Sequence, residues 1–149
     1  MIRCTPYNSE VKCKRTYNNN GYYLNHGTLG SNLIYCEDGN CNTLPNGNGF
    51  FMNDYSEINE CSSSQCQPFE PNNVQSCKYN TNEIILSNDE YKYCNQETQI
   101  QFKSEIQYYP LSNISTNPGK YPENIISGGD TILIKVDRYS ASQYITSGI

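Results

Sequence analysis

The chain has 149 residues and a net charge of −5, with 21 Asn, 14 Tyr, no Trp and a single His. Only 36% of its residues are hydrophobic and 17% are charged, so its core is small and another source of stability is needed. Residues 16–77 contain six acids and no Lys or Arg, which argues against nucleic acid and suits a basic or hydrogen-bonding partner. No stretch approaches the roughly 18 apolar residues of a membrane span, so no membrane insertion is expected.

The eight cysteines supply the missing stability if they form disulfides, as in small extracellular scaffolds. Eight cysteines allow on the order of 100 pairings, and we expect the nearest-neighbour set. Two Cys-x4-Cys pairs also resemble a four-cysteine zinc site, but four further cysteines and the polar composition favour disulfides. The expected bridges are Cys4–Cys13, Cys36–Cys41, Cys61–Cys66 and Cys77–Cys94.

The start of the chain is basic, because residues 1–15 carry a net charge of +3. It contains no apolar run of the kind found in signal peptides, so we expect this sequence to be an excerpt of a longer secreted chain. The segment between Cys4 and Cys13 is interpreted as a degenerate unit that precedes a repeat.

The repeat is the most informative feature of the sequence. Residues 21–25 (GYYLN) are echoed by residues 49–53 (GFFMN), and each is followed by an apolar couplet and Cys-x4-Cys. A Gly-aromatic-aromatic-aliphatic-Asn run indicates a short strand between turns. We therefore predict two copies, about 21–41 and 49–66, each a disulfide-clipped pair of short strands that packs against its neighbour.

The second half has a different pattern. Residues 83–87 and 91–94 flank Asn88-Asp89 as a hairpin closed by Cys77–Cys94, and residues 98–109 alternate like one half-buried strand. Residues 113–129 are expected to be loop, followed by strands over 131–137 and 142–146, with little helix.

These elements predict an all-β fold in which short disulfide-clipped strand repeats are packed with, or capped by, an antiparallel sheet. Residues 1–76 form a Cys-rich repeat region and residues 77–149 an antiparallel β region, and together they are expected to make one compact domain.

Catalytic chemistry is poorly represented. His26 is the only base available for a triad or a Cys-His pair, and its Asn-His-Gly context indicates an ordinary loop histidine. The adjacent acids Asp89 and Glu90 are best explained as solvated turn residues rather than a glycosidase pair. We expect no enzyme activity, no cofactor and no metal.

The aromatic residues are the strongest functional signal. If Leu24 and Met52 point inward, strand alternation places Tyr22 and Phe50 inward and leaves Tyr23 and Phe51 outward, together with Asn25 and Asn53. Tyr and Asn on a rigid frame suit a protein-binding surface, whereas the alternative is that these rings cover neighbouring repeats. The candidate partner-binding residues are Tyr23, Tyr35, Phe51, Asp54, Tyr55 and Glu57.

The run Gly-Tyr-Tyr-Leu-Asn followed by Leu-Ile-x-Cys-x4-Cys resembles the repeats of the very large, Asn- and Tyr-rich scaffoldins of anaerobic gut fungi. Residues 21–66 carry the resemblance, and the second copy departs from it at Phe50-Phe51-Met52 and Asn59-Glu60. The resemblance implies a secreted, non-catalytic, cohesin-like module that binds the dockerins of cellulosomal enzymes. It supplies no binding residues and implies nothing about calcium.

Two other functions remain open from the sequence. One is a carbohydrate-binding module for plant cell-wall polysaccharide with tyrosines as sugar platforms, against which the lack of Trp counts. The other is a structural or adhesive repeat without a discrete ligand.

Overall fold

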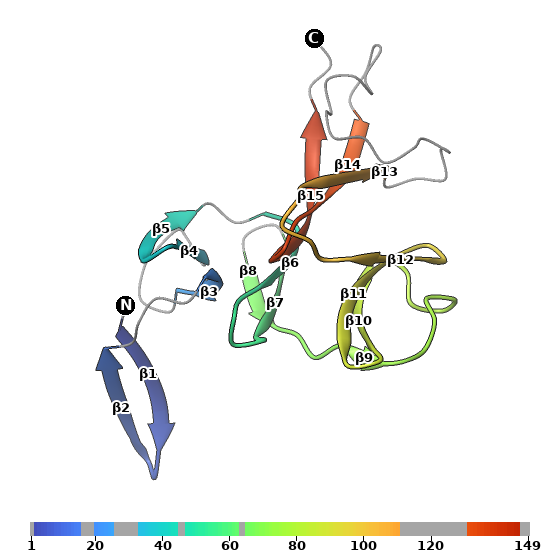
Figure 1. Ribbon diagram of the computed structural model, residues 1–149. Coiled ribbons are helices and arrows are strands. Elements are labelled where there is room, and N and C mark those ends of the chain that lie inside the picture. Colours follow the sequence, from blue (N-terminus) through green and yellow to red (C-terminus); the bar gives the residue numbers. More distant parts are fainter. Residues whose placement is uncertain are drawn as a thin grey trace.

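The computed structural model describes residues 2–15, 20–25, 33–44, 47–62, 65–110 and 131–146. These residues form strands and turns without any helix, and the sheets are almost entirely antiparallel (Figure 1). The expected all-β, disulfide-rich fold is confirmed. No helix in the described residues is long and apolar enough to cross a membrane.

The two sequence copies are three-stranded meanders rather than strand pairs, because the second cysteine of each copy and the residues that follow it belong to a third strand. In both copies the leading glycine lies opposite the first cysteine, Gly21 opposite Cys36 and Gly49 opposite Cys61. We call them unit A, which comprises β3 (Gly21–Leu24), β4 (Leu33–Glu37) and β5 (Asn40–Leu44), and unit B, which comprises β6 (Gly49–Met52), β7 (Ile58–Ser62) and β8 (Gln65–Pro68).

A third meander, which we call unit C, has the same register without the sequence signature. Gln107 takes the place of the leading glycine opposite Val136, and Val136 pairs with Ala141 where units A and B have their cysteine pairs. The pattern was missed in the sequence because both cysteines and the glycine are replaced. Unit C consists of β13 (Gln107–Pro110), β14 (Thr131–Val136) and β15 (Ser140–Thr146).

Strands of units B and C join in one sheet of order β13-β14-β15-β6-β7-β8. The contact between the units is the antiparallel pairing of β15 with β6, in which Ala141 lies opposite Phe50 and Ser142 opposite Gly49. Gly49 has a φ of +144°, and a Cβ atom there would lie 2.3 Å from the Ala141 carbonyl oxygen. Glycine is therefore required where the two units meet.

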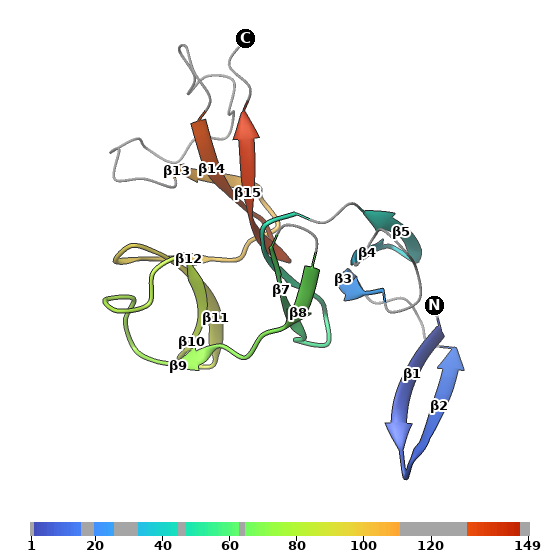
Figure 2. The same ribbon diagram turned by 180° about the vertical axis from the view of Figure 1, so that it is seen from behind.

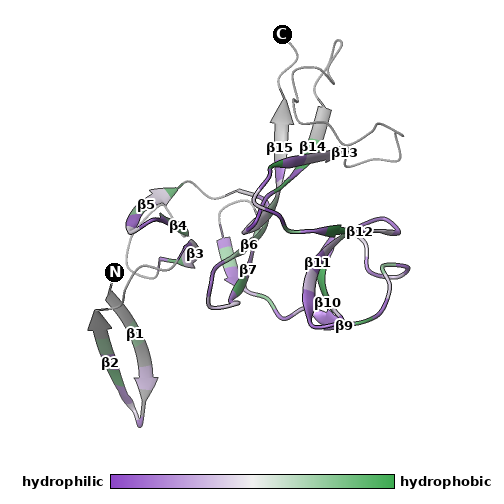
Figure 3. Ribbon diagram, in the orientation of Figure 1, coloured by the Kyte–Doolittle hydropathy of each residue, from purple (hydrophilic) through white to green (hydrophobic). Residues whose placement is uncertain are grey.

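A separate sheet follows unit B, with strand order β12-β11-β10-β9. The predicted hairpin is confirmed, since Asn88 and Asp89 both have positive φ, as a tight two-residue turn requires. Strands of this sheet carry hydrophobic segments, whereas the loops that extend from it are largely hydrophilic (Figure 3). Its strands are β9 (Asn72–Asn73), which is parallel to β10, then β10 (Glu83–Ser87), β11 (Glu90–Asn95) and β12 (Thr98–Gln101).

The prediction of one strand over residues 98–109 is wrong. β12 ends at Gln101, and the chain enters a different sheet at Gln107. Ile100 is buried, but Ile106 at the same phase of the alternation is 43% exposed. Between them only Phe102 packs against the main core, and the exposed polar residues that follow it carry the chain from one sheet to the other.

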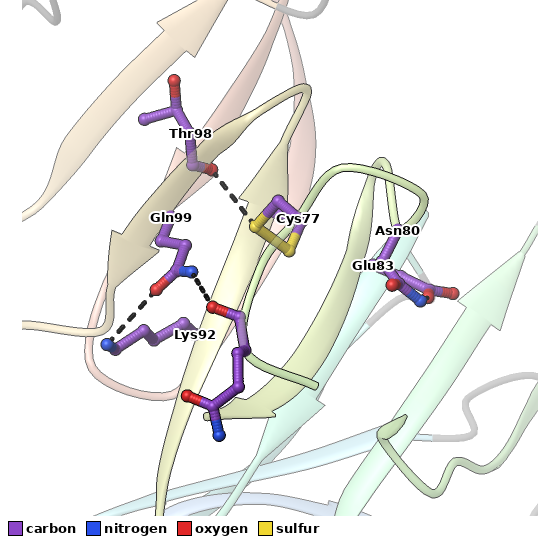
Figure 4. Close-up of a disulfide and its surroundings, with 8 residues drawn as sticks. Cys77, Asn80, Glu83, Lys92, Thr98 and Gln99 are labelled. Atoms are coloured by element: carbon purple, nitrogen blue, oxygen red, sulfur yellow. Dashed lines mark hydrogen bonds between the residues drawn. A yellow bond between two sulfur atoms is a disulfide. The ribbon is translucent and has the colours of Figure 1, made fainter. Parts of the chain in front are cut away.

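The Cys77–Cys94 disulfide fastens the loop before β10 to strand β11 (Figure 4). The Cys77 Sγ atom lies 3.8 Å from the Thr98 carbonyl oxygen, and the Gln99 amide donates a hydrogen bond of 3.0 Å to the Gln75 carbonyl oxygen. Cys77, Cys94 and Ile85 form a small buried cluster of their own. The disulfide therefore stabilises a loop that contributes little hydrophobic surface.

The other three disulfides each join residues that lie directly opposite one another in a hairpin. Their Cα atoms are 4.0 to 4.1 Å apart, as in the closer, non-hydrogen-bonded type of antiparallel pair. All four bridges join nearest neighbours in sequence, as expected above, and such bonds suit an oxidising environment. The pairs are Cys4–Cys13, Cys36–Cys41, Cys61–Cys66 and Cys77–Cys94.

The first of these bridges lies in an amino-terminal hairpin of β1 (Ile2–Tyr7) and β2 (Glu10–Arg15). This hairpin is a two-stranded sheet of its own and points away from the other sheets in both views (Figures 1 and 2). Val11 is 69% exposed, and Cys4 and Cys13 are exposed as well.

The main core is built from both halves of the chain. It unites unit B, the β9–β12 sheet and unit C, so the boundary near residue 77 does not separate two cores. Phe50 contacts the rings of Phe69 and Tyr93 across this core. Its buried members are Phe50, Met52, Ile58, Ile84, Tyr93, Ile100, Ile134, Val136 and Ala141.

The buried side chain of Tyr93 is expected to make the free energy of unfolding fall at alkaline pH. Burial raises the pKa of this phenol from 10.0 to about 12, so the folded state holds the proton more tightly than the unfolded state. Its contribution is complete below pH 10 and is lost as pH rises toward 12, at up to about 1.4 kcal/mol per pH unit. We expect urea unfolding to show this decline, and Tyr93→Phe to reduce its slope.

The matched control is Tyr79→Phe, because Tyr79 is 87% exposed. This variant should leave the slope of stability against pH unchanged. A Tyr93→Phe protein that loses stability as steeply as the parent between pH 10 and 12 would contradict the assignment.

Candidate functional site

The buried side chain of Asn53 forms the turn that follows strand β6. Its Oδ1 atom accepts hydrogen bonds from the backbone N–H groups of Tyr55 (2.9 Å) and Glu57 (3.3 Å). Its Nδ2 atom donates to the Tyr22 carbonyl oxygen in unit A (2.9 Å) and to the Glu57 carboxylate (3.1 Å). Asn53 thus fixes a turn in unit B and joins that turn to unit A.

Unit A approaches this turn closely because it begins with glycine. Gly21 has a φ of +113° and forms a β-bridge with Asn53, whose Cα would lie 2.3 Å from any Cβ at position 21. The preceding Asn20 exchanges two hydrogen bonds of 3.0 Å with Asp54, one from backbone to backbone and one from the Asn20 N–H to the carboxylate. The Asn20 side chain also accepts from the Asp38 N–H.

Asp54 continues this network into unit C. The Tyr139 hydroxyl donates a hydrogen bond of 2.6 Å to the Asp54 carboxylate and accepts one of 3.1 Å from the Arg138 guanidinium. Arg138 also lies over the Tyr139 ring, 5.3 Å from its centroid. Burial and the hydrogen bond to Asp54 raise the pKa of Tyr139. The Asp54 carboxylate therefore links all three units through one hydrogen-bond network.

The aromatic rings of units A and B pack behind this network. Tyr22 lies 4.7 Å from Tyr35 and 4.9 Å from Phe51, measured between ring centroids. Burial, followed by the negative charge of Asp137 in unit C, raises the pKa of Tyr22 to about 12. The Tyr22 ring of unit A is therefore influenced by the Asp137 carboxylate of unit C, so the units converge at one junction.

A pocket of about 390 Å³ opens beside the junction. Unit B forms one wall, the β9–β12 sheet forms a second, and the turn between β14 and β15 forms a third. Two of its rings, Tyr91 and Phe102, pack against the main core and are half-buried. We call it the junction pocket; it is lined by Met52, Asn53, Asp54, Ser56, Glu90, Tyr91, Gln101, Phe102, Arg138 and Tyr139.

The predicted outward orientation of Tyr23 and Phe51 is wrong, since they are only 5% and 6% exposed. Phe51 packs with Leu33 and Cys61, because unit A covers the face of β6 that a single sheet would leave in solvent. Tyr23 packs edge-on against Tyr55, with 6.2 Å between the ring centroids. Both rings therefore belong to the interior and support the exposed residues around them.

The other candidates divide into two places. Asp54, Tyr55 and Glu57 are exposed on the Asn53 turn, and Asp54 reaches the junction pocket. Tyr35 is half-buried against Tyr22 on unit A, where burial, reinforced by Glu37, raises its pKa. His26, the only candidate base, lies outside the described residues.

Sequence reasoning missed the residues that the β14–β15 turn contributes. Asp137 accepts hydrogen bonds of 2.8 Å from the backbone N–H groups of Tyr139 and Ser140, which fixes the turn and the direction of Tyr139. Asp-x-x-Ser is a recognisable local turn signal. What it could not reveal is the partner, because Asp54 lies 85 positions earlier in the chain.

The junction combines exposed polar groups, half-buried rings and a turn held in place by a buried amide. Within the described ranges no group of three or more His, Cys, Asp or Glu side chains is arranged to hold a metal ion. No protein-family model, curated protein or solved structure matches the chain.

Proposed function

We propose that this chain is a secreted, non-catalytic protein-interaction module that binds the dockerins of cellulosomal enzymes. The kind of partner comes from the resemblance of residues 21–66 to fungal scaffoldin repeats. The observation that supports a binding role is the exposed turn of Asp54, Tyr55 and Glu57, which Asn53 holds beside the junction pocket.

Preorganisation makes this turn suitable for recognition. A surface that is already ordered loses little entropy on binding, and buried aromatic anchors carry much of the energy of protein interfaces. Tyr55 is 42% exposed and its ring rests on the buried Tyr23. The carboxylates of Asp54 and Glu57 on either side would orient hydrogen-bond donors or cations of the partner.

The proposal is tested by titrating the oxidised protein with a purified fungal dockerin in a calorimeter. We expect saturable one-to-one binding, and we expect Tyr55→Ala to weaken it by about tenfold or more through loss of an anchor. Tyr79→Ala is the matched control, because Tyr79 is a highly exposed tyrosine on a loop outside the junction. Thermal unfolding of each variant shows whether its fold is intact.

An absence of heat at high micromolar concentrations, from a folded parent protein, would contradict dockerin binding. Equal weakening by Tyr55→Ala and Tyr79→Ala would instead place the interface away from the junction.

Carbohydrate binding is the second candidate, and the composition of the junction pocket favours it. Half-buried rings beside Gln101, Glu90 and Arg138 offer stacking surfaces together with hydrogen-bond donors and acceptors. Depletion of the protein from solution by insoluble cellulose, xylan or mannan would support this function. Binding to dockerin without depletion would exclude it for those polysaccharides.

A further inference from the structure

Units A, B and C share one rule of assembly. In each, the first strand pairs with the second strand so that its leading residue lies opposite the clip position, which is Cys36, Cys61 or Val136. In each, the clip residue is paired with a residue of the third strand five positions later. The first strand therefore always occupies the same edge of the hairpin made by the second and third strands.

The amino-terminal hairpin resembles those second and third strands in the direct pairing of its cysteines, which are nine positions apart rather than five. Cys4 lies opposite Cys13 with 4.0 Å between the Cα atoms, against 4.1 Å for Cys36 and Cys41. Its turn residues Asn8 and Ser9 both have positive φ, as Asp38 and Gly39 do in unit A. β1 thus corresponds to the second strand of a unit, yet within the described residues it pairs with β2 alone.

The register identifies the backbone groups on the outer edge of β1. Antiparallel pairs alternate between two types, and the Cys4–Cys13 pair is of the type that exchanges no hydrogen bonds. The N–H and C=O groups of Cys4 and Ile2 therefore point away from β2, whereas those of Arg3 point toward it. In units A, B and C, the first strand is paired with N–H and C=O groups of the second strand that point outward in this way.

Pro6 also faces this edge and has no N–H group to offer. It does not obstruct a first strand, because in unit A that strand reaches no further along β4 than Cys36, the counterpart of Cys4. Proline at an edge commonly limits unwanted pairing. Here it marks the end of the open edge and leaves Ile2 to Cys4 available.

We propose that the outer edge of β1 accepts an extended Gly-aromatic-aromatic-aliphatic strand from another polypeptide segment, with its glycine opposite Cys4. Strand addition at an exposed edge is a common mode of protein recognition. A two-stranded hairpin alone is marginally stable, so an added strand completes the three-stranded unit that occurs elsewhere in the chain. This interaction is independent of dockerin binding, since it uses a different element.

The test supplies the strand to the 149-residue chain. A segment with the sequence of residues 20–32, which contains the first strand of unit A, is added directly before Met1, so that Met1 takes the place of Leu33. Amide hydrogen exchange is then followed by NMR. We expect exchange at Ile2 and Cys4 to slow by about tenfold or more, and exchange at Arg3 to change little because Arg3 already faces β2.

The control carries the same extension with proline in place of the second aromatic residue, whose N–H would bind at Ile2. Slowing in the first protein but not in the control supports the proposal. Unchanged exchange at Ile2 and Cys4 in both proteins, with the other amides showing an intact fold, would overturn it. Equal slowing in both would overturn it too, because the effect would not depend on strand pairing.

Discussion

Replacing Gly49 by alanine is expected to destabilise the protein by about 3 kcal/mol or more, since overpacking and an unfavourable φ act together. The added methyl group would lie 2.3 Å from the Ala141 carbonyl oxygen and 2.6 Å from the Ser142 Cα atom. Both are backbone atoms of β15, so no side-chain rotation relieves the contact. Strands β6 and β15, whose pairing joins units B and C, would have to move apart.

Gly39→Ala is the matched control. Gly39 has a φ of +85° in the turn between β4 and β5, and a Cβ atom there meets nothing within 4 Å. It should cost only the backbone term, about 1 kcal/mol. Urea unfolding followed by near-ultraviolet circular dichroism measures both variants. Equal losses would show that the close approach of β15 to Gly49 contributes nothing.

Local signals were enough to predict much of this fold. The hairpin at Asn88-Asp89 was recognisable because the turn residues and both strands lie within a dozen positions of one another. The repeated Gly-aromatic strands were also recognisable, since each unit keeps its register within one short segment. Three of the four disulfides belong to the same class, because hairpins bring their cysteines together without any tertiary contact.

What the sequence could not provide depends on contacts between distant segments. Alternation correctly separated the two faces of β6, but it could not show that unit A covers the face bearing Phe51. Unit C was invisible because its register survives without the cysteines that marked the others. The hydrogen bond between Asp54 and Tyr139 joins units whose separation along the chain carries no periodic signal.

The candidate site follows the same division. Asp54, Tyr55 and Glu57 were selected from composition and lie together because they belong to one turn. Arg138 and Tyr139 complete the site and come from another unit, so they required the structure. Asn53 was expected to be an outward polar residue, yet it is 5% exposed and binds three backbone groups and one carboxylate.

Removing different disulfides should have very different consequences for the main fold. Cys61→Ser with Cys66→Ser is expected to lower the free energy of unfolding by about 3 kcal/mol. Loss of a short-loop crosslink accounts for roughly 2 kcal/mol of this, and a buried hydroxyl adds to it. Cys61 is 2% exposed and packs with Leu33 and Phe51, where units A and B meet.

Cys4→Ser with Cys13→Ser is the matched control, because that bridge closes a hairpin whose two cysteines are exposed and which forms a separate sheet. Its loss should loosen the hairpin and leave the main unfolding transition nearly unchanged, within about 0.5 kcal/mol. Since the chain has no Trp, tyrosine fluorescence and near-ultraviolet circular dichroism report the transition. Equal destabilisation by both pairs would mean that the amino-terminal hairpin unfolds with the main core, and that the stability of the fold is shared across all its sheets.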